Sequence, residues 1–552
     1  MKPHRGSISS SFWFLALPPL LAVSFCFVLP YGASFYNALS GGDRITVFQG
    51  AYIWRITAFT LWQAFYSVLI SLALGLPGAW FIGTSRSRFA PLLRTLTGVP
   101  FAMPSILVVL GFVLFFGNSG WVNTIILALR GEPEGTGPLR ILYRPQAIIL
   151  AHGFFNFPLV VRLAGDGLGR AQKAYGAAAA SLGASPAARA LTVIFPLAWP
   201  GILSAALLVF LYSFTSFAVV LVLGGGPAAS TLAVEIYRHG RIFLNYHNAG
   251  ALALMETAIA VTVFMAYASL AKKARGMSLD LQERVLEGEG RSPLGRLVLV
   301  IYGIAAALFI LGPLASILLE SFLQQTSRAS AQSLSLRWWG ALGDSYLPAL
   351  LRSLVLALSA ASLACVLAIL GAAFVKLLEN QGKANSFGAL LIRFASASPV
   401  ISSGIVLGLG WLIIYGRTFS RSPAALVLLH AVVALPFAFN SISEGFRSLP
   451  ANTLNAAMVF GAGPLKAFFG TALPLSLKQV RSAWGFAAAL SLGELNAVMM
   501  LGMEGWETLP LFIYRAAGAY RYGIACAAGT LLILCCAGAF ILSDMGAKRY
   551  DS

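Results

Sequence analysis

Long apolar stretches recur along the whole chain and limit what it can fold into more than any other feature. A transmembrane helix needs about 20 mostly apolar residues, and twelve stretches reach that length. They cover approximately residues 12–35, 57–83, 95–117, 145–166, 199–224, 247–271, 297–320, 353–376, 388–415, 424–445, 482–503 and 523–546. The predicted fold class is therefore an all-α polytopic membrane protein with about 12 transmembrane helices.

Composition excludes several classes of protein. Of the 552 residues, 58% are hydrophobic and 10% are charged, whereas soluble globular chains carry about 25% charged residues. We exclude a water-soluble enzyme, a disordered chain and a nucleic-acid-binding domain, although the net charge is +19. The five Cys lie in apolar stretches without metal-binding spacing, so we interpret them as small packing residues.

The basic residues indicate how the chain crosses the membrane. If the N-terminus is cytoplasmic, the cytoplasmic segments hold most of the Lys and Arg, for example Arg86, Arg88 and Lys272. Cytoplasmic loops of membrane proteins carry such an excess. We therefore predict that both termini lie in the cytoplasm.

The second half of the chain repeats the first at an offset of about 278 residues. His152 corresponds to His430, and Gly183 corresponds to Gly461. Each half contains six predicted spans, so the halves share one orientation and form parallel repeats, which enclose a pathway at their interface. The predicted division is a first repeat over 1–271, a charged linker over 272–296 and a second repeat over 297–552.

Two Ala-rich segments, within 171–196 and 449–474, share one pattern on the predicted cytoplasmic side. Each reads as a short helix, a Gly that ends it, a second short helix and a Pro where the chain re-enters the membrane. Such a loop suits the grip of a partner protein, and an ordinary helical hairpin loop is the alternative. The residues of the pattern are Ala177, Ala178, Ala179, Gly183 and Pro196, and Asn455, Ala456, Ala457, Gly461 and Pro474.

These residues give the chain a resemblance to a known family. Their spacing is similar to EAA-x3-G-x9-I-x-L-P, the pattern of the inner-membrane permease subunits of binding-protein-dependent ABC importers. Ala177 and Asn455 stand where that pattern has an acidic residue. The resemblance covers nearly the whole chain, and two such halves in one chain resemble the fused iron(III)- and thiamine-type permeases. Segments such as 490–494 and 508–514 are most similar to thiamine permeases.

The resemblance implies a type I importer permease with no catalytic residue, metal or cofactor of its own. It implies two copies of a cytoplasmic ABC ATPase at the two loops, which would hold ATP-Mg, and a periplasmic or lipid-anchored solute-binding protein. It also implies a bacterial inner-membrane location among lipid, with thiamine or its phosphates as the solute; iron(III) or another small cation is the alternative. The sequence contains no GxxxxGK[ST] motif, which agrees with ATP hydrolysis on another chain.

Two carboxylates, Glu256 and Glu494, lie well inside predicted spans. An intramembrane carboxylate is costly and usually faces a cavity, so we predict that they line the pathway of a small cationic solute, with aromatic rings as further ligands. A structural carboxylate paired inside the bundle is the alternative. The predicted pathway residues are Ser216, Phe217, Glu494, Asn496 and Glu256. For His152 and His430 we predict structural hydrogen bonds.

The outer segments 225–245 and 503–521 both contain Thr-Leu-x-x-x-Ile-Tyr-Arg. We predict that they form the docking floor for a binding protein, with two ordinary amphipathic outer helices as the alternative. Two other classes of protein compete with an importer permease: a self-sufficient secondary transporter or channel, and a membrane-embedded enzyme. An enzyme would need a cluster of His, Asp, Glu or Cys in the spans, where these residues are scattered.

Overall fold

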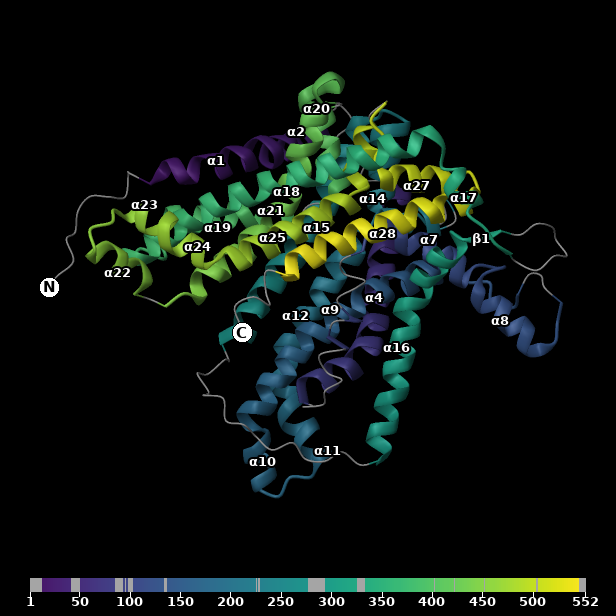
Figure 1. Cartoon of the computed structure of the whole chain (residues 1–552), viewed down its shortest axis with the longest axis horizontal. Helices are drawn as coiled ribbons and strands as arrows, with labels where there is room; N and C mark the ends of the chain where they lie inside the picture. Colours follow the sequence, from purple (N-terminus) through teal and green to yellow (C-terminus); the bar gives the residue numbers. More distant parts are fainter. Residues whose placement is uncertain are drawn as a thin grey trace. The chain divides into compact units, whose positions relative to one another are not determined.

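The structure is a computed structural model that is almost entirely helical (Figure 1). Its strands form one antiparallel ribbon of β1, Leu323–Gln324, and β2, Ser333–Leu334, among the described residues. The described residues are 12–40, 50–84, 93–94, 96–97, 103–133, 137–224, 226, 229–276, 293–324, 333–401, 403–420, 422–450, 452–502 and 505–545. The predictions for Arg86, Arg88 and the linker residues 277–292 fall outside them.

The helices follow one another with short connections. Those of the first half are α1 (Trp13–Val23), α2 (Leu29–Ser40), α4 (Ala51–Thr84), α7 (Ser105–Phe116), α8 (Trp121–Arg130), α9 (Pro145–Ala171), α10 (Ala177–Ser181), α11 (Pro186–Ala188), α12 (Phe195–Phe214), α13 (Ala218–Leu223), α14 (Leu232–Tyr237) and α15 (Tyr246–Gly276). Those of the second half are α16 (Pro293–Glu320), α17 (Arg337–Gly340), α18 (Gly343–Asn380), α19 (Phe387–Ala397), α20 (Gly404–Ser420), α21 (Pro423–Ser448), α22 (Thr453–Val459), α23 (Pro464–Ala467), α24 (Leu473–Leu475), α25 (Leu477–Gly493), α26 (Asn496–Leu501), α27 (Leu509–Gly518) and α28 (Tyr522–Met545).

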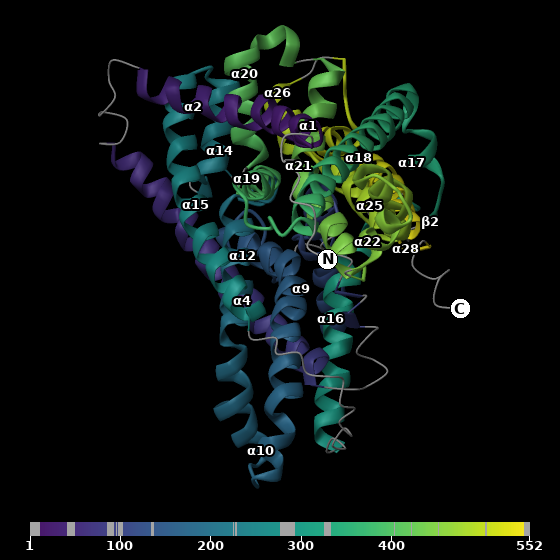
Figure 2. The same cartoon turned by 90° about the vertical axis from the view of Figure 1, so that its left-hand side faces the viewer.

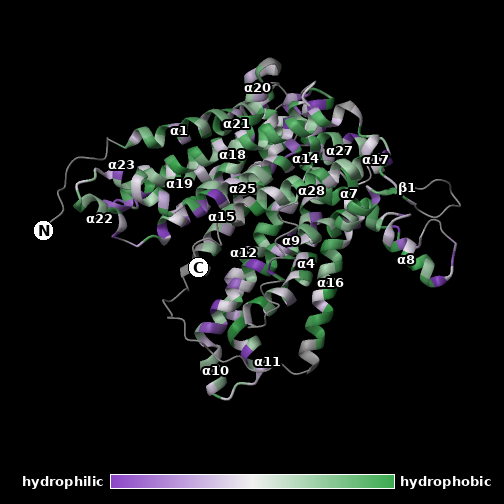
Figure 3. Ribbon diagram, viewed as in Figure 1, coloured by the Kyte–Doolittle hydropathy of each residue, from purple (hydrophilic) through white to green (hydrophobic). Residues whose placement is uncertain are grey.

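The spans confirm the predicted fold class. Within the described ranges, ten helices are long and apolar enough to cross a membrane, and the bent pair α19–α20 gives an eleventh if it is one span. Hydrophobic residues run along α16 and α28, while hydrophilic residues gather near α10 and α22 (Figure 3). The predicted spans 199–224 and 482–503 are each divided into two helices, α12 and α13 in the first case and α25 and α26 in the second.

The helices pack into two compact units that are not cut at the linker. The C-unit comprises the described residues of Met1–Gly42, Ile236–Ala251 and Leu336–Ser552. In it, α1 and α2 pack against helices of the second half, α18, α19 and α20. The ring of Trp13 lies 5.2 Å from that of Phe374, and Trp411 donates from Nε1 to the carbonyl of Cys26 at 3.0 Å.

The N-unit comprises the described residues of Asp43–Glu235 and Leu252–Ser335. Here α4, α9 and α12 form a bundle, with α16 of the second half against α7 and α4. Tyr302 of α16 donates to the carbonyl of Leu74 at 2.7 Å. The first helices of each half therefore pack with the other half's helices in both units, a non-local arrangement that apolar patterning does not reveal.

The helix boundaries repeat along the chain as the residue pattern predicts. The helix pairs α9 and α21, α11 and α23, and α13 and α26 each begin at positions that differ by the repeat offset. Cys26, Cys365, Cys526 and Cys536 are buried, which agrees with the packing role predicted for them.

Candidate functional site: two exposed loops and two broken helices

The first loop has the predicted helix–Gly–helix structure. The short helix α10 ends at Gly183, whose φ of 83° is left-handed, and α11 follows with Ser185 Oγ accepting from Ala188 N at 3.2 Å. A π-helical turn, Arg189–Ile194, leads into α12, where Pro196 occupies the first turn. Figure 2 shows α10 at the end of the α4, α9 and α12 bundle.

The second loop has the same structure in the C-unit. The helix α22 ends at Gly461, whose φ is 87°, then α23 and the π-helical turn Phe468–Ala472 lead to α24, which contains Pro474. Two buried side chains, Leu454 and Phe468, fix this loop to the core. Figure 1 shows α22 and α23 together at one end of this unit.

The predicted loop residues differ in exposure. Ala178, Asn455 and Ala456 are exposed, Ala177 and Ala457 are half-buried, and Ala179 is buried. Both Pro196 and Pro474 are exposed. Asn455 accepts a hydrogen bond at 3.0 Å from Asn380, at the end of α18. The exposed residues of the predicted pattern are therefore small and uncharged.

The predicted pathway residues lie where two helices break. Ser216 and Phe217 fall in the gap between α12 and α13, and Glu494 falls in the gap between α25 and α26. Ser216 is half-buried, whereas Phe217 is fully buried. The breaks occupy equivalent repeat positions, so each half contributes one discontinuous helix, the arrangement that forms solute sites in other transporters.

Glu494 caps the helix that follows it. Its Oε1 accepts from Ala497 N at 3.0 Å, and the carboxylate lies against Gly404, where α20 begins. The side chain of Glu494 is half-buried, and beside it Asn496 Oδ1 is buried without a hydrogen-bond partner among the described residues. This break and the first residue of α26 therefore carry two oxygen acceptors.

Glu256 lies elsewhere, within α15, and its side chain is 1% exposed. It belongs to the N-unit, whereas Glu494 belongs to the C-unit. Glu494 and Asn496 thus lie at the same helix break, whereas Glu256 is buried on a separate helix.

The helices α14 and α27, which lie in the two predicted outer segments, are anchored in matching ways. The N–H of Leu232 donates to Thr60 Oγ1 at 3.1 Å, and the N–H of Leu509 donates to Ser353 Oγ at 2.7 Å. Burial raises the pKa of the Tyr237 phenol, and the positive charges of Arg241 and Arg515 act in the opposite direction and lower it. Arg241 also donates to the carbonyl of Gly502 at 3.2 Å. Matching parts of both repeats therefore meet in the C-unit.

Comparison with known proteins agrees with the resemblance to importer permeases. Residues 75–275 match the family described as binding-protein-dependent transport system inner membrane component. The chain is 29% identical over 546 residues to the thiamine transport system permease protein of Brucella abortus (strain 2308), which covers 96% of this chain and 94% of that protein. It is 28% identical over 503 residues to the protein of the same name from Escherichia coli (strain K12), covering 90% and 89%.

A shorter relative decides the family. The spermidine/putrescine transport system permease protein of Escherichia coli (strain K12) is 30% identical over 212 residues, 38% of this chain and 76% of that protein. The chain belongs to the binding-protein-dependent transport permeases. It is a permease with two fused halves, and the matched residues 75–275 include the first loop.

Sequence reasoning missed a buried polar cluster in the N-unit of the permease. Gln63 donates to the carbonyl of Ser213 at 2.9 Å, Asn156 donates to Ser213 Oγ at 3.1 Å, and Ser67 Oγ lies 3.1 Å from Nδ1 of His152. The last contact confirms the predicted structural hydrogen bond of His152. A signal was present, because polar residues recur at helical spacing in the apolar stretch 57–83.

A second missed contact joins α4 to the segment before α14 in the same unit of the permease. Glu235 is 1% exposed and accepts from Tyr52 at 2.7 Å and from Ser230 at 2.6 Å. Its repeat counterpart is Phe512, so the repeat itself gave no signal for a carboxylate there.

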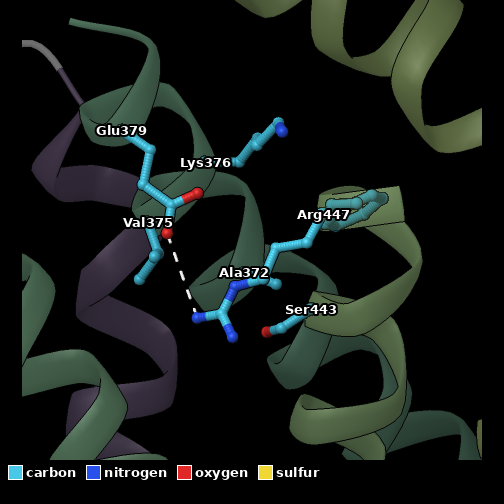
Figure 4. A pocket seen from close by; sticks show the side chains of 7 residues that line it. Ala372, Val375, Lys376, Glu379, Ser443 and Arg447 are labelled. Atoms are coloured by element: carbon cyan, nitrogen blue, oxygen red, sulfur yellow. Dashed lines mark ion pairs between the residues drawn. The ribbon is translucent and has the colours of Figure 1, made fainter. Parts of the chain in front are cut away.

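A small pocket of the permease lies between α18 and α21 (Figure 4). Glu379 accepts from Arg393 at 2.6 Å and lies 3.9 Å from Arg447. Lys376 and Ser443 also line the pocket. These ion pairs join α18 to α19 and to α21, and α21 leads into the second loop. Among the described residues, no group of three or more His, Cys, Asp or Glu is arranged to hold a metal.

Proposed function

We propose that this permease carries thiamine or its phosphates across the bacterial inner membrane as the membrane subunit of an ABC importer. The observation that carries the proposal is the similarity, over 96% of the chain, to a relative named as a thiamine transport system permease protein. The similarity spans both halves and both loops rather than one domain, as we expect for two permeases that carry the same substrate.

Energy comes from a partner in this proposal. One copy of a cytoplasmic ABC ATPase binds each loop and holds ATP-Mg, because the chain has no phosphate-binding GxxxxGK[ST] motif. Closure of the two ATPase subunits on ATP draws the loops together and opens the permease outward. The loops suit this role because each is a rigid helix–Gly–helix with an exposed face.

The solute passes the two helix breaks. Thiamine carries a fixed positive charge, and the Glu494 carboxylate with the free acceptor Asn496 Oδ1 offers two oxygens to a cation. Ser216 provides a hydroxyl at the matching break of the other half, while Phe217 and Glu256 support the pathway from the packed interior. This arrangement would favour a small cation over an anion of the same size.

The other proposed partners are those of an ABC importer. A periplasmic or lipid-anchored solute-binding protein docks on the anchored outer helices α14 and α27. Both termini lie in the cytoplasm, the chain is surrounded by lipid, and no nucleic acid takes part. Another small cation, including iron(III), is the second candidate substrate, favoured by the relative named for spermidine and putrescine transport.

Uptake of labelled thiamine into cells that lack their own thiamine importer tests the proposal. We expect uptake only when the permease, its ATPase and its binding protein are expressed together, with competition by excess thiamine. Stronger competition by iron(III) or spermidine than by thiamine would move the substrate to the second candidate. Uptake by the permease alone would contradict the borrowed ATPase.

A further inference from the structure

The pocket between α18 and α21 is built from residues that replace glycines of the first half. Three of the four polar residues that line it correspond to glycines: Lys376 to Gly83, Ser443 to Gly165 and Arg447 to Gly169. In the first half, a Cβ at Gly83 would lie 2.6 Å from the carbonyl oxygen of Gly165, so α4 and α9 are in close contact. In the second half, the same positions carry polar side chains, and a pocket lies between the helices.

Basic side chains outnumber carboxylates at this pocket. Arg393 donates to Glu379 at 2.6 Å, whereas the guanidinium of Arg447 lies 3.9 Å from the same carboxylate oxygen, too far for a hydrogen bond. Lys376 forms no ion pair with a described carboxylate. Glu444, near the same end of α21, is exposed and does not line the pocket. Lys376 and Arg447 therefore keep donors for another anion.

A buried hydroxyl adds a third donor. Ser443 is 9% exposed, and its Oγ is buried without a hydrogen-bond partner among the described residues. Buried polar groups are nearly always paired, so an unpaired one needs an explanation. Figure 4 shows the side chains of Ser443 and Arg447 extending from α21 toward α18. A hydroxyl, a guanidinium and an ammonium at one pocket are the donors that bind a phosphate oxyanion.

The pocket lies at helix ends, where a membrane protein meets lipid headgroups. The helix α21 has 26 residues, or about 39 Å at 1.5 Å per residue, and a bilayer with its headgroup regions is about 40–45 Å thick. Arg447 is the second-to-last residue of α21, and Lys376 lies about one turn before the end of α18. Phospholipid phosphates occupy this depth of the membrane.

An apolar face on α19 favours a lipid over a free phosphate. Phe387, Leu390 and Phe394 are 77%, 50% and 71% exposed, and their spacing places them on one face of the helix. The ion pair between Arg393 and Glu379 fixes α19 beside the pocket. Acyl chains can cover this face when the phosphate is bound, whereas a soluble phosphate leaves it uncovered.

We propose that Lys376, Ser443 and Arg447 bind the phosphate of an anionic phospholipid, whose acyl chains lie along the apolar face of α19. Basic pockets between transmembrane helices bind anionic headgroups in other membrane proteins. A zwitterionic lipid is a poorer ligand, because its own cation is repelled by the two basic side chains. The glycines of the first half leave no such donors there, so each chain binds one lipid in this way. The inference does not depend on which solute the permease carries.

The test titrates the purified full-length permease in detergent with phosphatidylglycerol and counts bound lipids by native mass spectrometry. We expect one tightly bound phosphatidylglycerol per chain and weaker binding of phosphatidylcholine. Lys376→Gln and Arg447→Gln should each weaken phosphatidylglycerol binding about tenfold or more, the loss typical of a hydrogen bond to a charged group. Lys376→Arg keeps the charge and should bind as the unaltered chain does.

Two further variants separate this site from general surface charge. Lys466→Gln is the matched control, because Lys466 is exposed on α23 outside the pocket, and it should leave binding unchanged. Glu379→Gln removes the carboxylate from the pocket and should tighten phosphatidylglycerol binding by up to about fivefold, the size of an exposed charge interaction. A gain of affinity is not expected from a variant that merely disturbs the fold.

The outcomes decide between the possible sources of phosphate. If soluble glycerol phosphate binds as tightly as phosphatidylglycerol, the ligand is a free phosphate and the lipid proposal fails. Phosphatidylcholine binding as tight as that of phosphatidylglycerol would also overturn it. Equal losses in Lys466→Gln and Lys376→Gln would show that surface charge, rather than this pocket, attracts the lipid. The thermal unfolding midpoint of each variant without added lipid shows whether its fold is intact.

Discussion

The equivalent helices of the two halves are held together by different interactions. His152 and His430 occupy one repeat position, but His152 pairs with Ser67 of α4, whereas His430 lies 2.8 Å from Ser491 of α25. Counted from the matching anchors Thr60 and Ser353, the counterpart of Ser67 is Ala360, which cannot pair. The histidine in the second half therefore takes its hydrogen bond from another helix, and its structural role is confirmed there too.

The rest of each core continues this difference. The first half joins α4, α9 and α12 through the hydrogen bonds of Gln63, Asn156 and Ser213. The second half packs α18, α21 and α25 through a cluster of small apolar residues that includes Ala360, Ala364 and Ala434. A repeat thus preserves helix positions while the forces between the helices change: directional bonds in one half, close apolar contact in the other.

The largest expected effect tests a close helix contact of the first half. A Cβ at Gly83 would lie 2.6 Å from the carbonyl oxygen of Gly165, so Gly83→Leu should force α4 and α9 apart. We expect a loss of about 3 kcal/mol or more in stability, measured by thermal unfolding in detergent. The second-half counterpart is Lys376, which lines an open pocket, so Lys376→Leu should be tolerated. Equal losses of stability in Gly83→Leu and Lys376→Leu would contradict this difference between the halves.

The next effect should be the same in both halves, because the loops share one design. Gly183→Asp or Gly461→Asp places a charged side chain at the partner-facing turn, and we expect uptake to fall at least about 100-fold with normal insertion, a loss of about 2.7 kcal/mol. Gly131→Asp is the control, since Gly131 has a similar φ of 67° and open space outside the loops. Normal uptake in both loop variants would refute the partner-binding role.

A smaller effect should distinguish the two helix breaks. Glu494→Gln keeps an oxygen for Ala497 N but removes the charge, and we expect about a tenfold fall in kcat/KM for a cationic solute, which is about 1.4 kcal/mol. Ser216→Ala at the matching break should change transport less. Unchanged uptake kinetics in Glu494→Gln would remove this carboxylate from the pathway.

The last test exchanges core chemistry between the halves. The counterpart of Gln63 is Leu356, so Gln63→Leu should cost about 0.6–1.7 kcal/mol of stability, the range for hydrogen bonds within membranes. Leu356→Gln buries an unpaired amide in an apolar core and should cost about 1–3 kcal/mol. Both are read as shifts of the thermal unfolding midpoint. A stabilising Gln63→Leu would show that the polar cluster does not hold the first half together.

Local features of this protein were predictable from the sequence, and non-local ones were not. The spans follow from apolar length, and the loop turns follow from Ala next to Gly183 and Gly461, so both were confirmed. The break at Glu494 was not predicted, because residues 482–503 form a continuous apolar stretch whose mean hydropathy is hardly changed by one carboxylate. That carboxylate caps the helix after the break. The packing of α1 against α18 depends on which half a helix contacts, and no residue pattern encodes that choice.

The most direct test of the importer account is transport in proteoliposomes that contain the purified permease and its ATPase, with the binding protein and labelled thiamine outside and ATP-Mg inside. We predict accumulation of thiamine that requires all three proteins and ATP, and no ATP hydrolysis by the permease alone. Accumulation driven by an ion gradient without the ATPase, or ATP turnover by the permease alone, would contradict the account.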